Sequence, residues 1–224
     1  MLPSQTVENY LKTIYLAQIA SPDQSALVPM GQLASTLGVV PGTATTMMKA
    51  LAESGLVHYE PYMGVRLTPA GTKLASLVLR RHRLIELFLV KVLNMSWTDV
   101  HDEAERLEHA VSERLIDRID EMLGRPAVDP HGDPIPTAEG TIAQPDHIDL
   151  ASAPIGASVT IERVVDQDPD FLRFIEDRDL MPGRQVRIAQ RDLAADALQV
   201  IPTSGEPIAI GMRAAAKVMV SLRG

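Results

Sequence analysis

Histidine and glutamate residues recur at helical spacing in one segment of the chain, and both residue types bind divalent metal ions. Four of them are His101, Glu105, Glu108 and His109. At roughly 100° per residue, these positions project within one stripe on a single helix face. Upstream, His82 and Glu86 are four residues apart, so they also share a helix face. The spacing predicts two neighbouring helices that together could hold metal ions.

Acidic residues dominate the second of these segments. Between Asp99 and Glu121 there are nine Asp or Glu residues and three Arg residues. Bound cations would relieve the repulsion among so many carboxylates. The alternative is a solvated acidic helix face with histidines at a dimer surface. A catalytic metal site is disfavoured, because neither an HExxH pattern nor a nucleophile with an acid–base partner accompanies the ligands.

Composition narrows the protein class further. The chain has 224 residues, no cysteine and a formal net charge of −8. Disulfides, iron–sulfur ligation and thiol catalysis are therefore excluded, and any metal must use nitrogen and oxygen ligands. The apolar runs are too short to cross a membrane, and the first residues lack a signal-peptide pattern, so we expect a cytoplasmic protein without membrane contact. The negative charge requires any DNA binding to be local.

The first part of the chain predicts three helices followed by a hairpin. Apolar residues at spacings of three and four indicate helices over 7–19, 30–37 and 41–56, with Gly38 between the second and third. Alternating residues at 56–59 and 65–68 flank a turn at 61–64, which indicates a β-hairpin. Two helices joined by a Gly-containing turn and followed by a hairpin predict a winged helix-turn-helix domain over residues 1–72.

The rest of the chain predicts a helical domain, a linker and a small β-domain. Helical patterns cover 73–93 and 97–123, the second ending at Gly124, and we assign them to a domain over 73–140. Prolines are frequent from 124 to 155, which favours a linker over 141–155. Strand patterns at 159–165, 185–189, 198–201 and 216–222, with one helix at 171–177, predict a β-barrel over 156–224. The expected fold class is α+β.

Several motifs, in this order along the chain, resemble the diphtheria toxin repressor family. They are YLKTIY at 10–15, the helix-turn-helix, LTPAG at 67–71, RHRLIE at 81–86, VHDEAERLEH at 100–109 and GDPIP at 132–136. The match runs over residues 4–136. The segment LMPG at 180–183, with the strands around it, resembles the SH3-like FeoA domain that ends many members of the family.

The resemblance implies a function for the whole chain. Members are transcriptional repressors that bind double-stranded operator DNA as homodimers when a divalent metal activates them. The middle domain would then serve dimerisation and metal binding. We expect a Mn(II)-activated repressor of metal-ion uptake genes, with Fe(II) as the alternative effector. A metal-dependent enzyme and a winged-helix protein controlled by a protein partner remain as rival hypotheses.

The resemblance also implies two metal sites, and so two ions per chain. The primary site matches Asn9, Glu105, Glu108 and His109. Glu105 stands where iron-responsive members have Cys, and a hard carboxylate suits Mn(II) better than a thiolate would. Asn9 replaces the Asp of manganese-responsive members and so lacks its charge. The second site matches His82, Glu86 and His101, with Asp168 as the expected ligand from the C-terminal domain.

Another residue bears on how the ions are arranged. Lys12 lies one turn after Asn9, where some manganese regulators have a bridging Glu. A lysine there disfavours a coupled pair of ions at the primary site, because it repels the cations. We therefore expect separate sites.

The DNA contacts implied by the resemblance lie on the third helix and on the hairpin. The helix contributes Pro41, Gly42, Thr43, Thr45, Thr46 and Lys49, and the hairpin contributes Tyr62 and Arg66. Threonine hydroxyls near a helix N-terminus can donate to phosphates, and threonine methyl groups can contact thymine methyls. The alternatives are ordinary first-turn capping for the threonines and an ion pair with Glu60 for Arg66.

Overall fold

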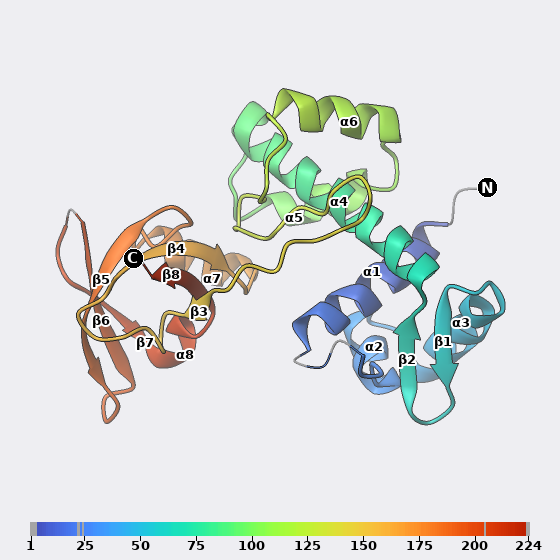
Figure 1. Ribbon diagram of the computed structural model, residues 1–224, viewed down its shortest axis with the longest axis horizontal. Helices are drawn as coiled ribbons and strands as arrows, with labels where there is room; N and C mark the ends of the chain where they lie inside the picture. Colours follow the sequence, from blue (N-terminus) through green and yellow to red (C-terminus); the bar gives the residue numbers. More distant parts are fainter. Residues whose placement is uncertain (1–3, 22, 24, 204, 223–224) are drawn as a thin grey trace. The chain divides into compact units, whose positions relative to one another are not determined.

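The computed structural model describes residues 4–21, 23, 25–203 and 205–222. Its contacts divide the chain into two compact units. The first unit contains the chain up to His82 together with Pro136–Ile142, and the second contains Arg83–Ile135 and Ala143–Gly224. Figure 1 shows the elements of both.

The first unit is a helix-turn-helix with a wing, as the sequence predicts. Its helices are α1 (Gln5–Ala20), α2 (Met30–Thr36) and α3 (Pro41–Glu53). Ser4 caps α1 by accepting a hydrogen bond from the Val7 N–H. Gly38, at φ +63°, makes the turn between α2 and α3. Fully buried Leu11, Ile14 and Met48 pack in one core.

The wing consists of strands β1 (Val57–Glu60) and β2 (Gly64–Leu67), which pair in antiparallel register. Val28 adds a bridge to Val65 on the other side of β2. Gly64 is required there, because a Cβ atom would lie 2.5 Å from the Val28 carbonyl oxygen. Behind the wing, α4 (Pro69–Leu93) starts earlier than predicted. The Thr68 hydroxyl accepts from the Gly71 N–H and so initiates this helix.

Two helices replace the single helix expected over 97–123, and that prediction is wrong. The structure has α5 (Val100–Leu107) and α6 (Glu113–Met122). The break has a local cause: Ser112 has extended backbone angles, and its side chain accepts from the Leu115 N–H at 3.3 Å, which starts a new helix. The apolar faces of these helices pack with α4 in a second core, which includes Leu84, Val100 and Ile116.

A short segment, residues 136–142, belongs by its contacts to the first unit. The Arg80 guanidinium donates to the Pro136 carbonyl oxygen at 2.9 Å, and the Lys73 ammonium donates to that of Ala138 at 3.0 Å. Ile142 packs against the core of the first unit. The segment that leads to the C-terminal part therefore first packs against α4 in the first unit.

The C-terminal part of the second unit is a six-stranded antiparallel sheet with two short helices. Its elements are β3 (Ile148–Asp149), β4 (Ser158–Val164), α7 (Pro169–Glu176), β5 (Gln185–Asp192), β6 (Ala197–Pro202), β7 (Ile208–Gly211), α8 (Met212–Ala215) and β8 (Val218–Leu222). The strand order is β3-β8-β4-β5-β6-β7. This order leaves β3 and β7 as edges, so within the described residues the expected barrel is an open sheet.

The α+β class is confirmed: a winged helix-turn-helix, a helical middle and a C-terminal β-domain follow one another. Among the described helices, none combines the length and the apolar character that a membrane span needs.

Candidate metal centre and nucleic-acid interface

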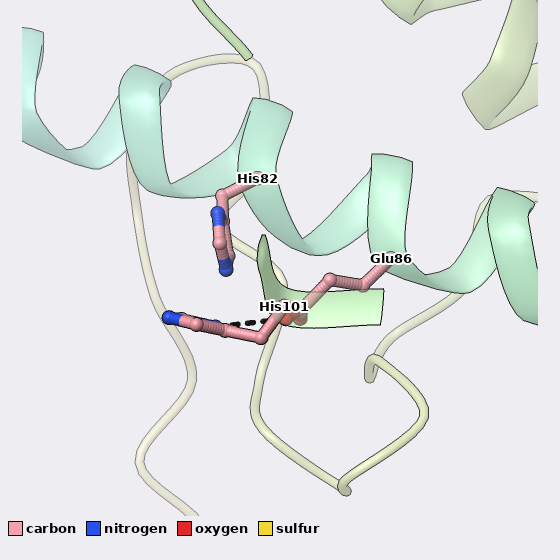
Figure 2. A group of neighbouring side chains, drawn as sticks. All are labelled: His82, Glu86 and His101. Atoms are coloured by element: carbon pink, nitrogen blue, oxygen red, sulfur yellow. Dashed lines mark hydrogen bonds and ion pairs between the residues drawn. The ribbon is translucent and has the colours of Figure 1, made fainter. Parts of the chain in front are cut away.

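Helices α4 and α5 bring three expected ligands together. His82 and Glu86 lie one turn apart on α4, and Figure 2 shows both side chains with His101 of α5. Each offers one ligand atom, and these atoms lie within 4.8 Å of one another. Glu86 Oε1 is 3.3 Å from His101 Nδ1. His82 and Glu86 are buried, whereas the His101 side chain is 45% exposed, so the cluster has one open side.

A second group contains His82 with Glu105 and Glu108, whose ligand atoms also lie within 4.8 Å of one another. Glu105 is inside α5, and Glu108 is the residue at which the helix ends. The Glu108 side chain is fully buried, and its Oε1 is 3.3 Å from His109 Nε2. Of the expected stripe, Glu105 and Glu108 therefore lie together, and His109, beyond the end of the helix, lies next to Glu108, whereas His101 belongs to the first group.

Asn9 occupies a half-buried position on α1 in the first unit. Its neighbour Glu8 forms a buried ion pair of 2.6 Å with Arg81, the residue before His82. This ion pair joins α1 to α4 next to Asn9 and His82. The side-chain oxygen of Asn9, Oδ1, is buried and has no hydrogen-bond donor among the described residues. A buried carbonyl oxygen without a donor has a free lone pair, which fits a metal ligand.

Asp168 is not in any of these groups within the described residues. It is exposed at the start of α7, where its Oδ1 accepts from the N–H groups of Asp170 and Phe171. Its carboxylate therefore caps a helix.

Sequence reasoning missed a third group, which consists of Glu86, Asp129 and His131. All three side chains are fully buried. The pKa of Asp129 lies well above its usual value because burial, and then the negative charges of Asp133 and Glu86, disfavour its ionised form, and Arg83 only partly offsets them. The available signal was the sequence Asp129-Pro130-His131-Gly132-Asp133, in which acids flank a histidine.

Helix α3 carries the residues expected to contact DNA, and their side chains differ in whether they hydrogen-bond within the helix. Thr45 and Thr46 donate their hydroxyl protons to the carbonyl oxygens of Pro41 and Gly42, at 2.9 and 3.0 Å. Thr43 and Lys49 make no side-chain hydrogen bond or ion pair within the described residues. A shallow hollow of about 400 Å³ on the exposed face is lined by Gly42, Thr43, Thr46, Met47 and Ala50.

The wing presents Tyr62 and Arg66 to the outside. Tyr62 is fully exposed at the turn, with φ at +68°. Arg66 is exposed and stands opposite His58 in the strand register, whereas Glu60 stands opposite Gly64. Within the described residues, Arg66 forms no ion pair with Glu60.

Three domain families match the chain in sequence. Residues 3–65 match the N-terminal DNA-binding domain of iron dependent repressors, and residues 68–137 match their metal binding and dimerisation domain. Residues 148–222 match the FeoA domain. The matches cover nearly the whole chain and follow the order expected from its motifs.

Curated relatives agree with these matches. The iron-dependent repressor IdeR of Mycobacterium tuberculosis (strain H37Rv) is 30% identical over 196 residues, which span 82% of this chain and 83% of that protein. The regulator MntR of Lysinibacillus sphaericus is 32% identical over 122 residues, or 54% of this chain and 84% of that protein. Both names describe regulators of transcription, and of the two only the name of IdeR states a metal, iron.

Solved structures share the complete fold. A manganese-dependent transcriptional repressor in complex with manganese has a TM-score of 0.89 and 40% identity, covering 97% of this chain and 100% of that one. The manganese regulator SloR has a TM-score of 0.73 and 30% identity, with complete coverage of both chains.

Proposed function

The chain belongs to the iron-dependent repressor family of metal-dependent transcriptional regulators, and on that premise we propose that it represses metal-ion uptake genes when Mn(II) activates it. It binds operator DNA as a homodimer and acts in the cytoplasm, without a catalytic role. The observation that carries the choice of metal is the donor set of the primary site.

That donor set contains only oxygen and imidazole nitrogen. Glu105 and Glu108 lie together with His82, and His109 is adjacent to Glu108. Carboxylate and carbonyl oxygens suit Mn(II), whereas softer thiolate ligands favour other ions, and the chain contains no cysteine. Asn9, whose Oδ1 has no donor among the described residues, completes the set.

Metal binding by these residues would couple the two units. Asn9 belongs to the first unit, and Glu105, Glu108 and His109 belong to the second. An ion held by all four restricts the angle between DNA-binding unit and helical unit. A dimer that reads two half-sites needs its recognition helices roughly 34–36 Å apart, so this restriction favours the binding-competent population.

A second ion per chain would bind to His82, Glu86 and His101. The helix spacing of His82 and Glu86 and the 3.3 Å approach of His101 to Glu86 support this site. Asp168 caps α7, and we leave it out of the proposed ligand set.

DNA recognition would use α3 and the wing. Pro41 and Gly42 start α3, Thr43 has a free hydroxyl for a phosphate, and Lys49 provides a backbone contact further along. Thr45 and Thr46 present methyl groups to thymine, because their hydroxyl protons are used inside the helix. Tyr62 and Arg66 of the wing reach the flanking backbone or minor groove.

The helical part of the second unit offers a surface for the dimer. Large apolar side chains are exposed there: Val92, Leu93, Leu107, Leu115 and Met122. Exposed apolar side chains on one domain are available to be covered in a protein–protein contact. The description of the matching family domain as one of dimerisation supports the same assignment.

A binding experiment separates this function from its rivals. Duplexes selected from a random library in Mn(II) are tested by gel shift with Mn(II), Fe(II) or EDTA. We expect binding in Mn(II) and none in EDTA. Preference for Fe(II) supports the iron-dependent alternative, metal-independent binding supports control by a protein partner, and failure to select any duplex overturns the repressor assignment.

A further inference from the structure

We propose that a hollow beside the wing binds a phosphate group, either from the DNA backbone or from a small phosphorylated molecule. The hollow has a volume of about 680 Å³ and lies within the first unit. Its walls include residues of β1 and β2, the start of α4, and residues 139–141 of the segment that returns to α4. Binding of a DNA phosphate would deepen the proposed function and rests on it, whereas binding of a small molecule is independent of it.

Two nitrogen-bearing side chains of the wing line this hollow. They belong to His58 of β1 and Arg66 of β2, which stand opposite each other in the strand register. Residues in such positions share one face of the strand pair, with Cβ atoms about 4.5–5.5 Å apart. Both side chains are exposed, and neither makes a hydrogen bond or ion pair among the described residues. A guanidinium beside an imidazole therefore offers several unused N–H groups, which suit phosphate oxygens.

Two hydroxyl groups add further donors to the hollow. Thr72 lies near the start of α4, and Thr141 lies on the returning segment. Within the parts of the chain that the structure describes, neither hydroxyl makes a hydrogen bond. The position of Thr72 near a helix N-terminus also favours an anion, because the helix dipole is positive there. Side chains from the wing, α4 and the returning segment therefore present unused donors to the same hollow.

Glu139 and Lys73 also line the hollow, and their opposite charges offset each other. The pKa of Glu139 lies below its usual range, chiefly because the Thr137 side chain and its own backbone N–H donate to its carboxylate. The positive charges of Lys73 and Arg80 contribute less. The Glu139 carboxylate is therefore held by its own turn and by α4, and the charge of Arg66 is left for a ligand.

The returning turn is held against α4 and forms a fixed wall of the hollow. The Lys73 ammonium donates to the Ala138 carbonyl oxygen at 3.0 Å. Gly140 has φ at +85°, and a Cβ atom there would lie 2.5 Å from the Ser76 hydroxyl oxygen, so glycine allows this close approach. A wall that is already ordered lowers the entropic cost of binding a ligand.

The walls favour a charged, oxygen-rich ligand. Small-molecule sites of about 300–1,000 Å³ are usually lined by apolar side chains, whereas most of the side chains here are polar or charged. A phosphate group accepts hydrogen bonds on several oxygens and carries the negative charge that Arg66 lacks nearby. DNA is one source of it, because Arg66 lies on the strand that leaves the wing tip at Tyr62. A phosphorylated small molecule is the other, since the volume lies in the range of such sites.

The first measurement needs neither metal nor DNA. Inorganic phosphate is titrated into the metal-free full chain at constant ionic strength, and nuclear magnetic resonance follows the His58 ring signals, assigned with His58→Gln. We expect a saturable shift that is lost in Arg66→Gln and in Thr72→Val. Arg187→Gln on β5 and Thr160→Val on β4 remove the same groups outside the hollow and should behave as wild type. Circular dichroism checks that each variant is folded.

The second measurement tests whether DNA supplies the phosphate. Fluorescence anisotropy in Mn(II) gives the affinity for a selected duplex at several KCl concentrations. Arg66→Gln should reduce the slope of log affinity against log salt by about 0.9, the value for one phosphate contact. Thr72→Val should weaken binding to every duplex roughly fivefold, through the loss of one hydrogen bond. If both side chains bind the same phosphate, the double variant loses less than the product of the two single losses.

The outcomes separate the two sources and the two proposals. A phosphate-induced shift with unchanged DNA binding in Thr72→Val supports a small phosphorylated molecule. A loss of DNA affinity in Thr72→Val that is not additive with Arg66→Gln supports the DNA backbone. The absence of a saturable shift, or a shift that both variants keep, together with additive effects on DNA binding, overturns the phosphate site alone. A wild-type protein that shows the shift but binds no duplex refutes the repressor function and leaves the site intact.

Discussion

Thr46 donates its hydroxyl proton to the carbonyl oxygen of Gly42, one turn earlier in α3, at 3.0 Å. The side chain therefore satisfies its donor inside the helix, and its methyl group is left for contact with DNA. Thr45 does the same with Pro41. The two threonines are therefore expected to contact DNA through their methyl groups and not through their hydroxyl protons.

Thr46→Ser should weaken operator binding, whereas Thr46→Val should leave it within about twofold. Serine keeps the hydroxyl but loses the methyl group, and a buried methyl-sized group contributes about 0.8 kcal/mol, or roughly a fourfold change in affinity. Fluorescence anisotropy in Mn(II) measures the effect, with Thr203→Ser in the second unit as the control. The reverse order of the two variants would show that the hydroxyl contacts DNA.

Glu108→Ala and His109→Ala should each abolish Mn(II)-dependent DNA binding while the protein stays folded. Each change removes a proposed ligand at a position with no substitute on the same stripe. Asp102→Ala, an exposed acid on the same helix α5, is the matched control and should bind as wild type. Gel shift and circular dichroism provide the readouts, and a normal metal response in either ligand variant contradicts the assignment.

Glu105→Cys should raise the response to Fe(II) or Zn(II) relative to Mn(II). A thiolate is a softer ligand than a carboxylate and favours these ions. The measurement is DNA affinity titrated against each free metal ion under anaerobic conditions, with Glu105→Asp as the oxygen-donor control. If the order of preference does not change, Glu105 does not bind the metal.

A cross-link between engineered cysteines at positions 9 and 105 should give DNA binding without metal. The link replaces the ion that would join the two units, and the absence of native cysteines makes the pairing unambiguous. The oxidised double variant is compared in EDTA with its reduced form and with each single variant. A folded, cross-linked dimer that does not bind in EDTA would show that restricting the units is insufficient for activation.

Asp129→Asn should stabilise the metal-free protein at neutral pH, by an amount on the order of 1 kcal/mol. The raised pKa of Asp129 means that the folded state binds a proton more tightly than the unfolded state does. The free energy of unfolding therefore falls as the pH rises from the ordinary pKa of an aspartate to the raised pKa of Asp129. The advantage of the variant should therefore shrink as pH is lowered. Urea unfolding in EDTA at several pH values measures it, with Asp102→Asn as the control, and an advantage that grows at low pH contradicts the cause.

Local patterns in the sequence determined the elements that carry the site. The 3.6-residue periodicity and the capping residues predict α1 to α4, and the alternating residues predict the wing, because these features act within a few residues of the chain. The same periodicity placed His82 with Glu86 and Glu105 with Glu108, since a helix fixes such neighbours by its own geometry. It failed at Ser112, where a side-chain cap outweighed the continuing helical pattern.

The tertiary structure alone decided which of these elements meet. The buried group of Glu86, Asp129 and His131 joins α4 to a loop more than 40 residues later, and no periodicity relates the two. The return of residues 136–142 to α4 depends on the Lys73 and Arg80 side chains, which donate to backbone carbonyl oxygens, and every residue has such an oxygen. Because the accepting group is the same in every residue, the sequence does not indicate which residue accepts such a hydrogen bond, and only the folded chain shows it.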